Sequence, residues 1–298
     1  MLTSSTETKA CQLVQLQIGK YTVAAVDTPG FDDDEDSDAV VLAKISRFLI
    51  AQHLLGIKLK GIVFLHDINI VRYSGSHTRF LETFCKLCGE DAFKNVALVT
   101  TMWGKENRGA RLEREAAIQS DPWAALIAKG ANVYQYDGTS DMAQTIVRLM
   151  LPKKGVVLRI QKELTKDDAE LEKTTAGASL AAELDKKLEK RQKQITFLTE
   201  EIERAEASHD DEGKQQLEGQ LRAERQKQLK QIKSRDALRP KIVEETGRSI
   251  GEADRERRAR GERWKSRLQI FATILSPIIA VTALYPSVGW SIAGCLEI

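Results

Sequence analysis

Residues 61–66 read GIVFLH and residues 95–101 read NVALVTT. Both runs are short and almost continuously apolar, which is typical of strands buried on both faces of a sheet. Between them, residues 79–87 carry apolar side chains at helical spacing. Two buried strands separated by a helix predict a parallel pair, because a parallel connection needs a long crossover.

The same alternation extends in both directions along the chain. Residues 11–18 alternate apolar and polar side chains, and a short turn at Gly19-Lys20 joins them to the β-rich run 21–26, so we expect a hairpin. Helices are predicted over residues 40–55, 112–119, 123–129 and 141–151, and another strand over 132–136. The predicted fold class is therefore α/β, with a mostly parallel sheet covered by helices on both faces.

One motif directly follows a predicted strand. Residues 27–31 read DTPGF, which puts the Asp27 carboxylate at a strand end and Gly30 three residues later. A strand-end aspartate can hold Mg²⁺ through water, and a glycine lets a backbone N–H approach a terminal phosphate. The alternative is an ordinary turn, because Pro-Gly is common in turns and aspartate often caps a helix.

Four stretches of the chain carry a family resemblance. They are VAAVDTPGFDDDEDSD (residues 23–38), LTSSTETKAC (2–11), GIVFLHDINIVRYSG (61–75) and LCGEDAFKNVALVTTMWG (87–104). Together they resemble P-loop GTPases of the group that contains septins and immunity-associated GTPases, and more closely G-domain proteins with coiled-coil tails. The resemblance spans about residues 2–150 and implies a fold that binds GTP and Mg²⁺.

The resemblance also implies roles for particular residues. Thr6 corresponds to the switch threonine on the metal, Asp27 to the metal-linked carboxylate, and Gly30 to the residue that senses the last phosphate. Typical members read guanine with Asn-Lys-x-Asp, where this chain has Thr100-Thr101-Met102-Trp103, so Thr101 and Trp103 are the expected base contacts. Trp103 cannot accept the hydrogen bonds of guanine, although it can stack on any base, so we do not expect guanine selectivity.

The chain departs from the family at the phosphate loop. No stretch matches G-x-x-x-x-G-K-[ST], and Phe31 stands where some GTPases carry a water-orienting glutamine. In the family the loop and the first strand would precede residue 2, and that strand lies between those corresponding to 21–26 and 61–66. We therefore expect residues 1–155 to form a truncated G domain, an incomplete sheet or one that closes differently. We also expect weak or no GTP binding, with hydrolase activity uncertain and little or none expected.

Composition restricts the remaining site chemistry. The formal net charge is only +2, and no segment combines a positive excess with interleaved aromatic residues, so nucleic acid is not an expected partner. Four scattered cysteines suit a reducing compartment. The pair Cys85-x-x-Cys88 is half a zinc or redox motif, and buried structural thiols are the favoured interpretation.

Residues 156–245 are charged and read as helix. Apolar residues recur at heptad spacing, and Arg191 interrupts them; the predicted seam is Leu184, Leu188, Ile195, Leu198, Ile202 and Ala205, resumed by Leu217, Leu221, Leu229 and Ile232. We expect a long coiled-coil helix through which the chain forms a homo-oligomer. A single charged helix and an αα-hairpin that bends near Gly213 are the alternatives.

The last part of the sequence is apolar. Residues 246–267 form a basic linker, and 268–296 carry no formal charge before Glu297, so a hydrophobic helix that attaches the chain to a membrane is predicted. Because Pro277 and Pro286 interrupt the run, a re-entrant hairpin and a buried docking helix remain alternatives. The expected location is the cytoplasmic face of a membrane, or the cytoplasm.

These patterns support two hypotheses of function. The first is a GTP-binding-family protein in which the absent phosphate loop impairs nucleotide binding. The second is a non-catalytic coiled-coil interaction protein tethered to a membrane.

Overall fold

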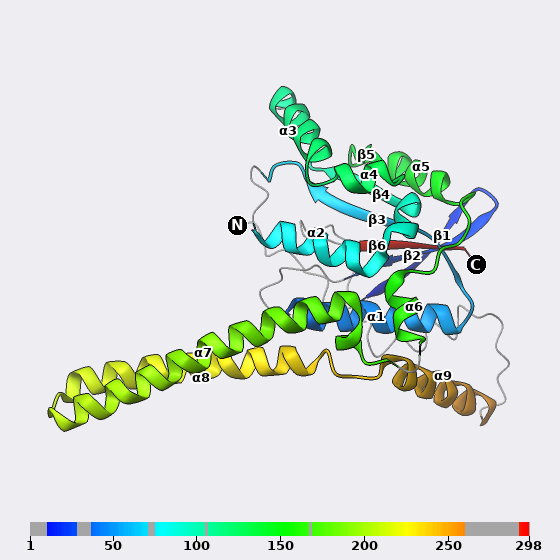
Figure 1. Cartoon of the computed structure of the whole chain (residues 1–298). Helices are drawn as coiled ribbons and strands as arrows, with labels where there is room; N and C mark the ends of the chain where they lie inside the picture. The colour runs from blue at the N-terminus through cyan, green and yellow to red at the C-terminus, as the bar shows by residue number, and fades with distance from the viewer. Residues whose placement is uncertain are drawn as a thin grey trace, which may run out of the picture.

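The computed structural model describes residues 11–28, 37–70, 75–104, 107–166, 169–259 and 292–297. Within this part of the chain, six strands form one sheet with the order β1-β2-β6-β3-β4-β5. Helices lie on both faces of the sheet, and two long helices extend away from it side by side (Figure 1). The predicted α/β class is therefore confirmed, but the sheet is mixed, because only the β3–β4 and β4–β5 pairs are parallel.

The N-terminal hairpin forms as expected. β1 (Gln12–Ile18) pairs antiparallel with β2 (Tyr21–Asp27) across the turn at Gly19-Lys20. Gly19 has a φ of 61°, a left-handed conformation that glycine adopts without a steric cost.

The three strands on the other side of the sheet are parallel. β3 (Lys58–Asp67) pairs with β4 (Val96–Thr101), and β4 pairs with β5 (Asn132–Gln135). α1 (Asp38–Leu54) precedes these strands. The helices between and after them are α2 (Gly75–Cys88), the 3₁₀ helix η1 (Glu90–Asn95), α3 (Arg108–Ser120), α4 (Ala124–Ala128), α5 (Ser140–Met150) and α6 (Arg159–Leu164). Each predicted helix and strand of this region thus has a counterpart.

Two apolar cores hold the helices against the sheet. The larger contains α1, α2 and α6 on one face, and its centre is Phe64, whose ring lies 5.0 Å from that of Phe80 and 4.9 Å from that of Phe84. The smaller lies under α5 on the other face, where Ile146 and Met150 are buried (Figure 1). The sheet is therefore covered on both sides, as parallel strands require.

The middle of the sheet differs from the expectation. β6 (Ile292–Glu297) lies between β2 and β3 and runs antiparallel to both, so the sheet is continuous where an unfilled gap was one of the expected outcomes. The prediction of one hydrophobic helix over 268–296 is wrong for residues 292–296, which form a strand. A short apolar run fits a buried strand as well as a helix, and periodicity alone cannot distinguish them.

The rest of that predicted membrane segment, residues 268–291, lies outside the described residues. Among the helices that the structure does describe, none has both the length and the apolar character needed to span a bilayer.

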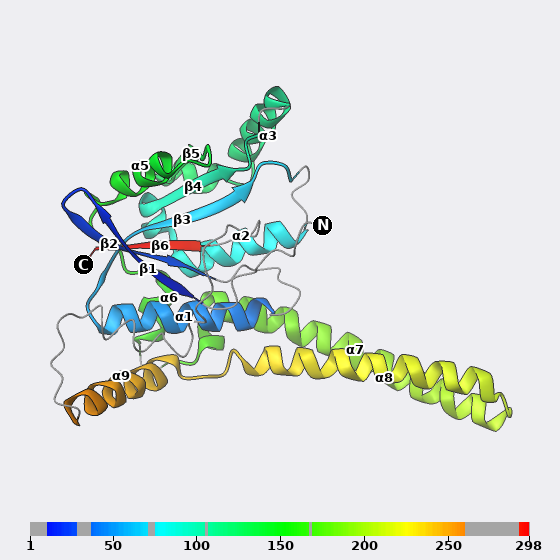
Figure 2. The same ribbon diagram turned by 180° about the vertical axis from the view of Figure 1, so that it is seen from behind.

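The helical region is a hairpin. After the 3₁₀ helix η2 (Leu171–Lys173), α7 (Thr175–Ala207) and α8 (Asp211–Asp236) pack antiparallel, and α9 (Ile242–Ala259) follows. Both views show α7 and α8 side by side and projecting from the α/β body (Figures 1 and 2). The predicted single long helix is therefore wrong, and the hairpin alternative holds with its reversal just before Gly213.

Local chemistry explains the reversal. His209 has a φ of 57°, which ends α7, and the Asp210 carboxylate accepts a hydrogen bond from the backbone N–H of Gly213 at 2.9 Å. Aspartate at this position caps the start of a helix, so α8 begins where α7 cannot continue.

The heptad seam is correct on α7 and partly wrong on α8. Ile195, Leu198 and Ala205 are buried, whereas Leu229 and Ile232 are 58 % and 41 % exposed. The less exposed positions of α8 include a series spaced by three and four residues, which is Leu217, Leu221, Glu224, Gln228, Gln231 and the buried Ser234. The true seam of α8 becomes polar after Leu221 because its residues meet polar partners on α7.

The base of the hairpin is fixed to the α/β body. The Lys86 ammonium on α2 donates to the Ser179 hydroxyl on α7 at 2.7 Å. The backbone N–H of Glu172 donates to the Leu238 carbonyl at 2.8 Å, which joins the segments before α7 and after α8. Arg47 on α1 pairs with Glu245 on α9 at 3.3 Å. The two arms of the hairpin therefore start from a common, anchored base.

Candidate functional site

The carboxyl ends of four strands meet at one edge of the sheet. β2 and β3 both run antiparallel to β6, and β3, β4 and β5 are mutually parallel, so β2 to β5 share one direction. Their last residues are Asp27, Asp67, Thr101 and Gln135. Ligands of open α/β sheets bind beyond this edge, so it is the first candidate site.

Asp27 lies half-buried at the end of β2, beside a buried thiol. Burial first, and the Asp27 carboxylate second, raise the pKa of the Cys11 thiol to about 12, while the Lys44 ammonium on α1 acts in the opposite direction. The Asp27 carboxylate and the Lys44 ammonium thus both lie near the Cys11 thiol. Thr6 and Gly30, the other residues expected at the phosphates and metal, lie outside the described residues.

Thr101 and Trp103 lie at the end of β4 and are both engaged in contacts within the chain. The Thr101 hydroxyl donates to the His66 carbonyl at 3.3 Å, which joins the ends of β4 and β3. The Trp103 indole N–H lies 3.0 Å from the Thr100 hydroxyl and 3.2 Å from its carbonyl. The Arg108 guanidinium lies 5.9 Å from the centre of the Trp103 ring, so this ring already carries a cation over it.

The predicted residues are not brought together at one point. β6 and β3 lie between β2 and β4, so Asp27 and Thr101 are three strand spacings apart, roughly 14 Å at about 4.8 Å per spacing. The carboxylate and the indole therefore mark two ends of the edge, and only an extended ligand could contact both.

A buried carboxylate on α3 was not predicted. Glu115 is 5 % exposed; its Oε1 accepts a hydrogen bond from the Thr100 hydroxyl at 2.8 Å and its other oxygen accepts one from the Gln135 amide. These bonds tie α3 to the ends of β4 and β5, beside Trp103. The signal in the sequence was Glu115 beside Ile118 on the inner face of an amphipathic helix, since an acid buried there needs partners.

Arg111, also on α3, holds the loops after β3 and β4. Its guanidinium donates to the Asn69 side chain at 3.1 Å and to the Gly104 carbonyl at 2.8 Å. Asn69 in turn donates from its backbone to the Asp67 carboxylate at 2.8 Å. The Asp67 carboxylate therefore stabilises the turn after β3.

Truncating the buried acid should loosen this end of the sheet. In Glu115→Ala the Thr100 hydroxyl and the Gln135 amide lose their acceptor, so we expect the free energy of unfolding to fall by about 1–2 kcal/mol. Urea unfolding followed by tryptophan fluorescence measures this. Glu115→Gln keeps one acceptor oxygen and is the matched control, expected to lose less than half as much; equal losses would contradict the hydrogen-bonded role.

The central strand of the sheet runs opposite to its two neighbours. β6 fills the position between β2 and β3, but it runs the other way, so its carboxyl end lies at the opposite edge of the sheet. A turn that follows β6 therefore cannot deliver backbone N–H groups to the edge that carries Asp27.

The described residues contain no group of three side chains suited to a metal ion. Cys88 is buried and Cys85 is half-buried, and burial raises the pKa of both thiols, to about 11 for Cys85. Both are therefore protonated at neutral pH, as structural thiols are.

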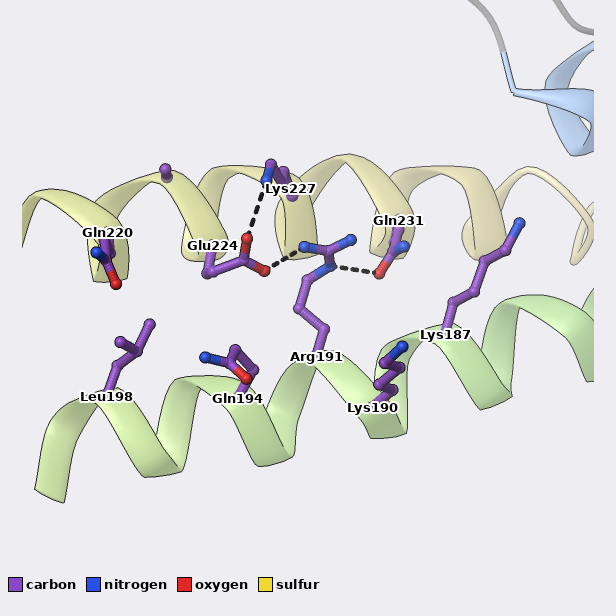
Figure 3. A pocket seen from close by; sticks show the side chains of 10 residues that line it. Lys187, Lys190, Arg191, Gln194, Leu198, Gln220, Glu224, Lys227 and Gln231 are labelled. Carbon is purple, nitrogen blue, oxygen red and sulfur yellow. Dashed lines mark hydrogen bonds and ion pairs between the residues drawn. The ribbon is translucent and has the colours of Figure 1, made fainter. Parts of the chain in front are cut away.

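A second candidate site is a groove along the hairpin, with a volume of about 680 Å³ (Figure 3). At its floor, the Arg191 guanidinium of α7 pairs with the Glu224 carboxylate and donates to the Gln231 side chain of α8 at 2.9 Å. Arg191 thus interrupts the apolar seam with a partly buried polar contact between the two helices, and polar contacts at such positions specify the register of paired helices. Lysines line the rim, at positions 187, 190 and 227.

Both candidate sites are described from the structure of this chain alone. No known family model matches the sequence, and no curated protein is significantly similar to it.

Proposed function

We propose that the chain is a GTP-binding-family protein whose nucleotide binding is impaired. The observation that carries this proposal is the carboxyl edge of the sheet, where Asp27 ends one strand and Thr101 and Trp103 follow another in the same direction. The order of parallel strands and the motif after β2 are those that the resemblance implies.

Binding is weak in this proposal because the phosphates lack their main ligands. A triphosphate is normally held by successive backbone N–H groups at a helix N-terminus and by a lysine. The sequence lacks the phosphate-loop motif, and β6 occupies the central place in the sheet in the wrong direction to provide one. Mg²⁺ held by Asp27 and Thr6 would neutralise part of the phosphate charge. It would not replace the backbone N–H groups and the lysine that hold the phosphates in place.

Catalysis is weaker still. Hydrolysis needs a group that orients the attacking water. Some GTPases use a glutamine for this, and this chain has Phe31 at the corresponding position. At the base end, the Trp103 ring, which carries the Arg108 guanidinium over it, can stack on any base. We therefore propose weak, base-tolerant nucleotide binding and little or no turnover.

Nucleotide titration of the full chain tests the proposal. With Mg²⁺ present, we expect a thermal shift only at GTP concentrations of about 1 mM and above, which corresponds to roughly 4 kcal/mol of binding free energy. ATP should give a similar shift, and Asp27→Asn should remove the Mg²⁺-dependent part. A submicromolar dissociation constant for GTP would overturn the impairment, and the absence of any Mg²⁺-dependent shift would favour the second candidate.

The second candidate is a non-catalytic interaction protein that uses the hairpin and is tethered to a membrane. It is favoured by the outer faces of the hairpin, where Phe197 is 53 % exposed and Leu229 and Ile232 share a face of α8. Since the seam between α7 and α8 is filled within the chain, a homo-oligomer would use these outer faces. Membrane attachment through residues 268–291, at the cytoplasmic face, belongs to the same proposal.

Sedimentation of the full chain tests this candidate. We expect a dimer at tens of micromolar, shifted to monomer by Leu229→Glu/Ile232→Glu, because two charges on one exposed face oppose its burial. Phe197→Glu on α7 should weaken the dimer as well, because Phe197 is exposed on the outer face of the other helix. Flotation of the same samples with liposomes tests the tether, and a monomeric chain that stays with the soluble fraction would reject both parts.

A further inference from the structure

The last strand occupies the centre of the sheet. β6 pairs with β2 over Val23–Val26 and with β3 over Lys58–Phe64, so both of its edges are used. In sequence it is separated from α9 by the 32 residues 260–291 and from β2 and β3 by far more. We call the space between these stretches of β2 and β3 the strand slot.

The strand slot has the width of one strand. With β6 removed, β2 and β3 would lie about 9.6 Å apart, twice the usual spacing, which is too far for their backbones to bond each other. Val23, Val26 and Phe64 on the two sides are fully buried under helices of opposite faces. Closing the slot would therefore require both cores to repack, whereas inserting one strand satisfies both edges.

The strand slot also restricts which strand fits. β6 pairs antiparallel with both of its neighbours, and its pairing with β3 shifts register between Leu59 and Gly61. Cys295 is the residue in register with Gly61, and it follows Ala293 and Gly294. The fitting ligand is an extended, antiparallel peptide with small residues at its middle positions, held mainly by main-chain hydrogen bonds.

We propose that the strand slot is a strand-acceptor site that exchanges its own β6 for the β6 of a second copy of the chain. Both copies offer the same slot and the same strand, so every contact made within one chain can be made between two. The 32 connecting residues reach up to about 110 Å when extended, which is enough to enter a neighbouring molecule. Exchange should therefore rise with protein concentration.

Disulfide trapping tests the occupancy of the strand slot in the full chain. Ala25 on β2 is the register partner of Cys295, and opposed Cα atoms of antiparallel strands lie within disulfide range. In Ala25→Cys, oxidised glutathione should link residues 25 and 295, as peptide mapping would show. Val23→Cys, two positions away and in register with Glu297, is the matched control and should not form the link. The other native thiols, Cys11, Cys85 and Cys88, react slowly because burial, complete or partial, raises their pKa.

A complementing pair tests exchange between molecules. Ala25→Cys/Cys295→Ser has only the acceptor thiol, and the unchanged chain has only the donor thiol, so neither alone forms the 25–295 link. Their mixture should give a covalent heterodimer that increases with concentration, and an excess of a synthetic peptide of residues 288–298 should replace it with a peptide adduct.

The outcomes separate the two parts of the proposal. Links to position 23 but not 25, or to neither, would overturn the strand slot as assigned. A link within Ala25→Cys chains without any heterodimer or peptide adduct would overturn exchange. Each substitution replaces a residue by one of similar size, so we expect every variant to fold. Circular dichroism before oxidation checks this.

Discussion

Replacing Gly177 by alanine is expected to lower the free energy of unfolding by about 3 kcal/mol, the upper end of what overpacking usually costs. Gly177 is buried in the first turn of α7, where an added Cβ would lie 1.9 Å from the Leu171 carbonyl oxygen and 3.0 Å from the Thr174 hydroxyl. A backbone oxygen cannot rotate away as a side chain can, so the chain itself must move.

The surrounding hydrogen bonds resist that movement. The Thr174 hydroxyl donates to the Leu171 carbonyl at 2.7 Å and accepts from the Gly177 N–H at 3.0 Å, which caps α7. The Leu171 side chain is fully buried, and the neighbouring Glu172 N–H bonds the Leu238 carbonyl after α8. Displacing Leu171 would therefore disturb the cap and the base of the hairpin together.

The matched control is Gly219→Ala on α8. Nothing lies within 4 Å of the position that its Cβ would take, so the change should stabilise the helix, by up to about 1 kcal/mol. Urea unfolding followed by far-ultraviolet circular dichroism measures both variants. Two changes of the same kind in one hairpin are thus expected to have opposite signs. An effect of Gly177→Ala within about 0.5 kcal/mol of zero would contradict the packing at the base of α7.

The α/β body could be predicted because its signals are local. The runs around Val63 and Leu98 are apolar enough to be strands, and the helices between them carry their own period. The same patterns predicted that Asp27 and Thr101 would end strands at one edge, because parallel strands end together.

The central strand could not be predicted, because its position depends on distant contacts. Residues 292–297 read IAGCLE, with the small residues Ala293 and Gly294 in the first half of the run. Nothing within this run specifies β2 and β3 as its partners. The register of α8 failed for a related reason, since leucine at position 229 fits a heptad but Arg191 selects Glu224 and Gln231 instead. The position of β6 and the register of α8 were both decided by contacts with distant parts of the chain, and the local spacing of apolar residues does not show these contacts.

The candidate site was predicted only in outline. Trp103 was identified as a residue at the base end, but its cover by Arg108 and its bond to Thr100 depend on how α3 docks. That docking relies on Glu115, a charged residue whose burial is indicated in the sequence only by its place three positions before Ile118. Buried polar contacts of this kind become visible only when the elements are assembled.

Mild acid should destabilise the chain through His66. This residue lies on β3 beside the ring of Trp123, with its side chain 1 % exposed and 5.7 Å between the ring centres. Burial, and to a lesser degree the charge of His77, lower the pKa of His66 from its ordinary value of 6.5 to about 4. The folded chain therefore holds this imidazole neutral where the unfolded chain would protonate it.

The sign of the effect follows from proton counting. Between pH 6.5 and pH 4 the unfolded state binds the extra proton, so stability falls as the pH is lowered through this range and is fully present above it. From pH 7 to pH 5 the expected loss from this one group is about 2 kcal/mol.

His66→Leu removes the titrating group while keeping a similar volume. From pH 7 to pH 5 the unchanged chain should therefore lose about 2 kcal/mol more unfolding free energy than this variant, whatever the carboxylates contribute to both. If the two stability curves of the unchanged chain and His66→Leu run parallel over this range, the imidazole is not held neutral by the core, and the packing of β3 against Trp123 would need to be reassigned.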